Sequence, residues 1–233
     1  MSSSAVIKNI LSRYNENELI LASKLFKNEL IGKITETAYY KTLERMCKAG
    51  ELVKIAKGTY HLPKIGKYGV VPPSEAEIIE KFTENEKGTV IGYSLYNSLK
   101  LTTQISKIIN VMTSNIDAET KTIRNIIIHQ APMKFSEDIK NAIHSMEVLQ
   151  NFYKIQDINY NYFLEYTKIL AQNYSEKAFK EVIEKMNYKK ATIAFLREIL
   201  NYYGTSNNLN NYLSTLSEYK HPRMEELYET TRI

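Results

Sequence analysis

The sequence predicts an α+β protein with a small N-terminal domain over residues 1–70 and a mixed domain over residues 71–233. Three observations lead to this prediction. The N-terminal part has three segments of helical periodicity followed by two short β-prone runs. A stretch rich in proline and glycine, PKIGKYGVVPPS, then indicates a linker at a domain boundary. Beyond it, β-rich segments come first and helical periodicity follows.

The N-terminal domain begins with residues 5–14, where four apolar side chains recur at helical spacing. A polar break, NENE, separates them from residues 18–27, which predict a second helix or a short extended piece leading into one. The clearest helix of this part runs from Thr35 to Gly50. Thr35 is suited to cap its N-terminus, and Gly50 is suited to end it as the C′ residue.

This third helix separates its side chains into two faces at about 100° per residue. We expect the first face to pack into the core, with Cys47 buried as a small hydrophobic side chain. The second face is polar, and we expect it to be exposed. The first face comprises Tyr39, Leu43, Met46 and Cys47, and the second comprises Thr37, Lys41, Glu44, Arg45 and Lys48.

Two β-prone runs, residues 52–55 and 59–62, follow the third helix. The turn Ala56-Lys57-Gly58 lies between them, and its glycine is suited to a positive φ. Three helices followed by a β-hairpin with a basic tip is the order of a winged helix-turn-helix. The sequence therefore predicts this fold for residues 1–70.

The second domain is predicted to contain short strands over about residues 89–130 and helices over about 136–217, ending in a polar tail. At its start, Ser74 and Glu77 have the spacing of a capping box. Two β-rich segments, 106–115 and 122–130, are separated by a polar turn, and we expect them to pair as antiparallel neighbours in a small sheet.

The positive charge is concentrated in the N-terminal third of the chain. Residues 1–70 contain twelve Lys and Arg against six Asp and Glu, whereas residues 71–233 contain nineteen against twenty. A nucleic-acid-binding domain joined to a neutral domain has this distribution. A basic surface without a binding role has the same distribution of charge. Charge alone therefore does not distinguish a nucleic-acid-binding domain from such a surface.

Binding of double-stranded DNA is the function for which these residues supply a mechanism. A helix with a cationic face fits the major groove, where Arg45 would read a guanine edge and Lys41 and Lys48 would contact phosphates. Lysines of the hairpin would lie beside the backbone or the minor groove. The candidate DNA-binding residues are Thr35, Thr37, Tyr40, Lys41, Arg45, Lys48, Lys54 and Lys57.

The sequence does not predict an enzyme, a cofactor or a metal site. It lacks phosphate-binding glycine motifs, paired metal-ligating cysteines or histidines, and a nucleophile elbow. The single cysteine excludes an intramolecular disulfide and a multi-cysteine zinc site. We expect no signal peptide, and no apolar run approaches the roughly 20 residues that span a bilayer, so we expect a cytoplasmic protein with no membrane partner.

The run YKTLERMCKAGELVKIAKGTYHLPK (40–64) resembles the wing region of AbiEi-type proteins, the antitoxins and transcriptional regulators of type IV toxin–antitoxin systems. The resemblance continues in PPSEAEIIEKF, in GYSLYNSLKLTTQISKIINVMTSN and in KKATIAFLREIL. Within the wing region it is carried by Leu43, Gly50, Lys54, Gly58, Tyr60 and Pro63.

The resemblance implies a cytoplasmic repressor that binds inverted repeats in its own promoter. It also implies a nucleotidyltransferase-like toxin as genetic partner, neutralised without a stable complex. Two alternatives remain open. One is a protein-interaction adaptor in which the winged helix is structural. The other is a nuclease-like enzyme within residues 75–230, which needs a carboxylate cluster where only Asp117 and Glu119 are near.

Overall fold

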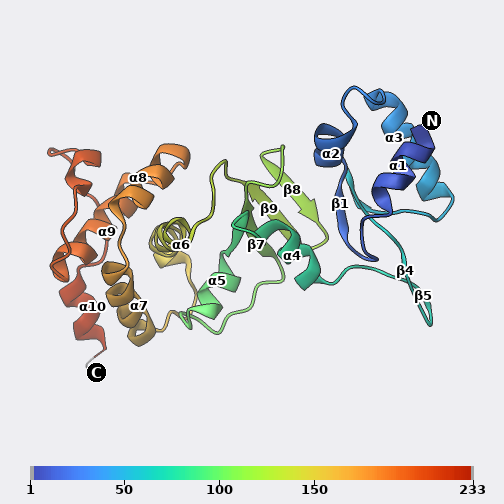
Figure 1. Ribbon diagram of the computed structural model, residues 1–233. Coiled ribbons are helices and arrows are strands. Elements are labelled where there is room, and N and C mark those ends of the chain that lie inside the picture. The colour runs from blue at the N-terminus through green and yellow to red at the C-terminus, as the bar shows by residue number, and fades with distance from the viewer. Residues whose placement is uncertain (1–2, 232–233) are drawn as a thin grey trace. The chain divides into compact units, whose positions relative to one another are not determined.

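The computed structural model describes residues 3–231, which form a mixed α+β structure (Figure 1). The chain separates into two compact units. The first unit runs through Lys81 and includes Thr122–Arg124, and the second comprises Phe82–Lys121 and the chain from Asn125 onward. The first unit therefore extends beyond residue 70 and takes in most of α4 (Glu75–Thr83).

The first unit contains the helices that the periodicity predicts. Of the two alternatives for residues 18–27, the extended piece leading into a helix is the one that forms. The helix expected from Thr35 is confirmed, with Gly50 at φ +74° directly after its last turn. The elements are α1 (Ser3–Leu11), β1 (Leu19–Leu21), α2 (Ala22–Leu25), its π-helical continuation η1 (Phe26–Leu30) and α3 (Glu36–Lys48).

A three-stranded antiparallel sheet completes this part of the unit. The expected hairpin forms from β2 (Val53–Ala56) and β3 (Thr59–His61), with Gly58 at φ +65° in the turn. β1 pairs with the other edge of β3, which gives the strand order β1-β3-β2. The core between the helices and this sheet contains Ile7, Ile20, Leu25, Leu30, Tyr39, Leu43, Leu52 and Tyr60.

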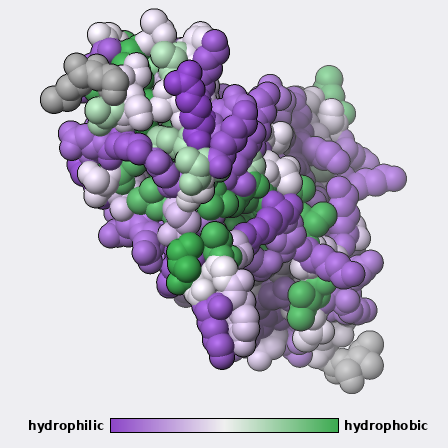
Figure 2. Space-filling model, turned by 90° about the vertical axis from the view of Figure 1, so that its right-hand side faces the viewer, coloured by the Kyte–Doolittle hydropathy of each residue, from purple (hydrophilic) through white to green (hydrophobic). Residues whose placement is uncertain are grey.

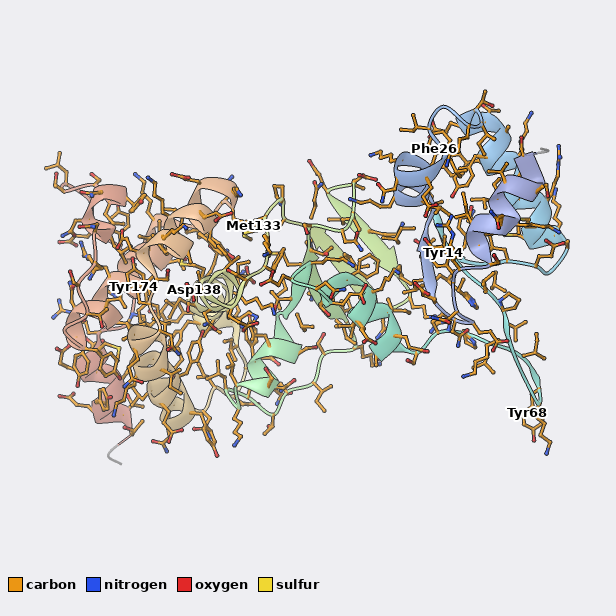
Figure 3. The ribbon with its side chains drawn as sticks, viewed as in Figure 1. Tyr14, Phe26, Tyr68, Met133, Asp138 and Tyr174 are labelled. Carbon is orange, nitrogen blue, oxygen red and sulfur yellow. The ribbon has the colours of Figure 1, made fainter. Side chains whose placement is uncertain are left out.

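The linker predicted from the prolines and glycines after residue 62 forms a second hairpin instead. β4 (Lys64–Gly66) and β5 (Gly69–Val71) pair antiparallel around the turn Lys67-Tyr68. Two glycines opposite each other at the turn, with β-branched residues behind them, favour a hairpin over an irregular linker. Tyr68 at the tip is 93% exposed and Ile65 is 72% exposed (Figure 3).

The sheet of the second domain corrects the expected antiparallel pairing. Its strands are β6 (Gly88–Ile91), β7 (Ile109–Thr113), β8 (Thr120–Ile123) and β9 (Ile126–Gln130), in the order β6-β7-β9-β8. β6 pairs antiparallel with β7, but β7 and β9 are parallel. The segment 122–130 is not one strand, because the chain reverses at Arg124, with φ +54°, after an earlier reversal between β7 and β8. Two reversals return β9 to the direction of β7.

Helices follow this sheet as the change of period predicts. Several start at a serine or asparagine cap; the Ser136 hydroxyl, for example, accepts a hydrogen bond from the backbone N–H of Ile139 at 3.4 Å. The elements are α5 (Tyr93–Ser98) between β6 and β7, then α6 (Glu137–Asn151), η2 (Phe152–Lys154), α7 (Tyr160–Gln172), α8 (Glu176–Lys185), α9 (Lys190–Tyr202), η3 (Leu209–Tyr212) and α10 (Met224–Thr230).

The core of the helical part is aromatic. The ring of Phe152 lies with its centroid 4.8 Å from that of Phe163 and 5.5 Å from that of Phe195. The expected polar tail beyond residue 217 contains α10, because Met224 and Leu227 recur at helical spacing and are buried against this core. Among residues 3–231, no helix has both the length and the apolar character that crossing a membrane requires.

Candidate nucleic-acid interface

The two faces of α3 are separated as the periodicity predicts. Tyr39 and Leu43 are fully buried, whereas Lys41 and Arg45 are exposed. Cys47 was expected to be buried but is only partly buried, since it lies at the border between the two faces. Burial raises the pKa of its thiol. The exposed residues of the predicted set on or beside α3 are Thr35, Thr37, Lys41, Arg45 and Lys48.

The N-terminus of α3 is capped by Thr35. Its hydroxyl oxygen accepts a hydrogen bond from the backbone N–H of Ala38 at 3.3 Å. This bond satisfies one of the N–H groups that the first turn of a helix leaves without an intrahelical partner. Thr35 thus sets the start of the exposed face, and Thr37 follows within the first turn.

Tyr40 differs from the rest of the predicted set, because it is partly buried. Its ring centroid lies 5.1 Å from that of Tyr39, and the side chain packs against the core of the first unit. The structure therefore gives Tyr40 a packing role at the edge of the exposed face.

Glu44 lies within the cationic face and pairs with Lys48. The Lys48 ammonium nitrogen is 2.9 Å from a Glu44 carboxylate oxygen, and both side chains are largely exposed. The hydrogen bond from Lys48, followed by its charge, lowers the pKa of the Glu44 carboxyl group. An exposed i,i+4 pair of this kind is weak and is screened by salt.

The β2–β3 hairpin adds two exposed lysines, Lys54 on the edge strand β2 and Lys57 in the turn. Lys54 lowers the pKa both of the Glu44 carboxyl group and of the Cys47 thiol through its charge. The charge of Lys54 thus acts on Glu44 and Cys47 of α3, an effect that residue spacing alone did not indicate.

Several acidic side chains of this part that lie outside α3 are engaged in ion pairs. Glu51 pairs with Lys8 at 2.8 Å and Glu29 with Arg13 at 2.7 Å. Of the ion pairs found within residues 3–231, none includes Lys41, Arg45 or Lys54. Figure 2 shows hydrophilic side chains over much of the face turned to the viewer, with apolar patches between them.

The β4–β5 hairpin carries further cations that sequence reasoning missed. Residues 63–73 contain two lysines and no acidic residue. The ammonium nitrogen of Lys67 lies 5.4 Å from the ring centroid of Tyr68, a cation–π distance. Interpreting Gly66-Lys67-Tyr68-Gly69 as a two-residue hairpin turn would have identified them as an exposed basic tip.

The two acids nearest to the expected nuclease-like site do not belong to a metal-binding cluster among the described residues. Asp117 and Glu119 lie in the connection between β7 and β8. Within the described part of the chain, no group of three or more histidine, cysteine, aspartate or glutamate side chains is arranged to hold a metal ion.

Comparison with known proteins gives a family without an assigned function. No curated protein matches the chain. Residues 6–159 match the profile of DUF6088, a family of unknown function. Because this match covers more than half of the chain, the protein belongs to the DUF6088 family.

Proposed function

We propose that the first unit is a winged helix-turn-helix that binds double-stranded DNA, and that the protein is a transcriptional regulator. The observation that carries this proposal is the exposed cationic face of α3, on which Lys41 and Arg45 have no acidic partner among the described residues. The order of α1, β1, α2 with η1, α3 and the β2–β3 hairpin supports the fold. In this assignment α3 is the recognition helix and β2–β3 is the wing.

The chemistry of the face suits the two kinds of contact that DNA offers. The Arg45 guanidinium presents paired N–H donors that match O6 and N7 of guanine in the major groove. Lys41 and Lys48 bind phosphates, which position the helix without reading sequence. Lys54 and Lys57 extend the positive surface to the hairpin, where they neutralise phosphates beside the groove.

The resemblance of residues 40–64 to AbiEi-type proteins extends the proposal. The chain would act in the cytoplasm as an antitoxin that represses its own operon by binding inverted repeats in the promoter. Its genetic partner would be a nucleotidyltransferase-like toxin, without a stable complex between the two proteins. In this proposal the protein is not an enzyme and uses no cofactor.

The test is a gel-shift titration with the DNA upstream of the gene. Changing Lys41, Arg45 and Lys48 together to alanine is expected to weaken binding by well over tenfold and to reduce the salt slope by about one for each phosphate that is no longer neutralised. The control changes three exposed lysines of the second unit, Lys168, Lys177 and Lys190, to alanine. It alters the net charge equally and is expected to leave affinity nearly unchanged. Equal losses of affinity in the two variants would contradict the assignment of α3.

A further inference from the structure

The helical part of the second unit contains a cavity of about 170 Å³ that is partly open to solvent. Residues of α6, α7 and α8 line it, and so does Tyr174 in the connection between α7 and α8; Figure 3 labels Tyr174 and Asp138 of α6. Its inner wall is apolar, with Leu170, Phe179 and Leu196 almost completely buried. Ala142 on α6 adds only a methyl group to this wall, so the space beside it is left open.

The size of the cavity corresponds to one aromatic ring with a short substituent. An engineered cavity of roughly 150 Å³ lined by Leu, Ile and Phe stays dry and binds benzene. Protein interiors are otherwise close-packed, and an empty apolar space of this size lowers stability. A bound apolar group would restore the missing packing.

The polar side of the cavity contains one carboxylate. Asp138, an exposed residue in the first turn of α6, supplies a carboxylate, whereas no lysine or arginine is among the lining residues that the structure describes. The nearby Lys140 ammonium is paired with Glu137 at 2.8 Å. His144 also lines the cavity, but burial lowers its pKa to about 4, so its ring is neutral at pH 7.

We propose that this cavity binds a small aromatic amine, with the ring against Ala142, Leu170 and Phe179 and the protonated amine at the Asp138 carboxylate. The apolar wall selects the ring, and the carboxylate selects the cation. This site lies within the second unit and does not depend on DNA binding.

The experiment compares three probes that share one ring and differ in charge. Benzylamine, benzyl alcohol and benzoate are titrated into the full chain without DNA by calorimetry, and the thermal midpoint is followed in parallel. Benzylamine is expected to bind at least about tenfold more tightly than benzoate, because a charge-assisted hydrogen bond to Asp138 forms only with the amine. The thermal midpoint is expected to rise with benzylamine concentration.

Two variants separate the ring site from the charge site. Asp138→Asn is expected to remove the preference for benzylamine over benzyl alcohol and to leave the affinity for the alcohol unchanged. Ala142→Leu fills the cavity and is expected to abolish binding of all three probes without lowering the thermal midpoint. The matched control, Ala76→Leu on the exposed side of α4, is expected to bind like the original protein.

Three results would overturn the proposal: no binding by any of the three probes, equal affinity for benzylamine and benzoate, or full binding by a folded Ala142→Leu variant. If Ala142→Leu does not fold, the exposed Asp138→Asn change still decides the charge preference.

Discussion

The hydroxyl group of Tyr39 donates a hydrogen bond to the backbone oxygen of Ala22 at 3.1 Å and so connects α3 to α2 inside the first unit. The Tyr39 ring is fully buried, and its centroid lies 5.3 Å from that of Phe26. Burial raises the pKa of this hydroxyl well above its usual value. The proposed recognition helix is thus held from its buried face, which leaves its cationic face available.

Two substitutions of Tyr39 are expected to destabilise the protein to different degrees. Tyr39→Phe deletes one buried hydrogen bond and is expected to lower the free energy of unfolding by about 0.5–1.5 kcal/mol. Tyr39→Ala leaves a cavity and is expected to cost about 3–5 kcal/mol. Urea unfolding followed by circular dichroism measures both. Tyr68→Ser, at a 93% exposed position, is the control and is expected to stay within about 0.5 kcal/mol.

Single changes on α3 are expected to distinguish a base contact from a phosphate contact. Arg45→Ala is expected to cost about 1–3 kcal/mol of binding free energy and to relax the preference for guanine at one position of the operator. Lys41→Ala is expected to weaken binding to all sequences alike and to reduce the salt slope by about one. Fluorescence anisotropy with an operator and single-base variants, at several salt concentrations, measures both. Identical salt and sequence effects for the two variants would rule out these separate roles.

Glu44→Gln is expected to strengthen DNA binding. The substitution removes a negative charge from the α3 face and releases Lys48, which Glu44 holds at 2.9 Å. Because an exposed pair of this kind is worth at most about 1 kcal/mol, the gain is expected to be about two- to fivefold at low salt and to shrink as salt rises. Glu51→Gln, which releases Lys8 instead, is the matched control. A weaker operator complex for Glu44→Gln would indicate that this carboxylate itself accepts a hydrogen bond from the DNA.

His144 is expected to make the second unit sensitive to acid. Its Nε2 lies 2.7 Å from the Thr89 hydroxyl oxygen, and burial lowers its pKa from 6.5 to about 4. A group whose pKa is lower in the folded state adds stability above its unfolded pKa, and this stability is lost as the pH falls from about 6.5 to 4. The loss expected is about 2–4 kcal/mol.

Urea unfolding of the original protein and of His144→Gln at pH 7 and pH 4.5 tests this. The variant is expected to lose less stability between the two pH values. Glu147 acts in the opposite sense, since burial raises its pKa and its contribution is lost as the pH rises through the folded value. Because both proteins contain Glu147, its contribution cancels when their losses of stability between the two pH values are compared. Equal pH dependence of the two would show that His144 is not responsible.

Much of the fold could be predicted because its signals are local. The capping box at the start of α4 is one example, since the Glu77 N–H donates to the Ser74 hydroxyl at 3.2 Å and the Ser74 N–H donates to the Glu77 carboxylate at 2.6 Å. The faces of α3 follow from the helical period alone. Most of the candidate site lies on this helix, so its exposed members could be named in advance, whereas Tyr40 proved to be partly buried.

By itself, the sequence determined the helix periods, the caps, the Gly58 turn and the concentration of positive charge in the N-terminal third. Each of these depends on residues within a few positions of one another. The tertiary structure alone decided the parallel pairing of β7 with β9 and the cavity beside Ala142. These features join segments far apart in the chain, and their free energies depend on packing that no local pattern encodes.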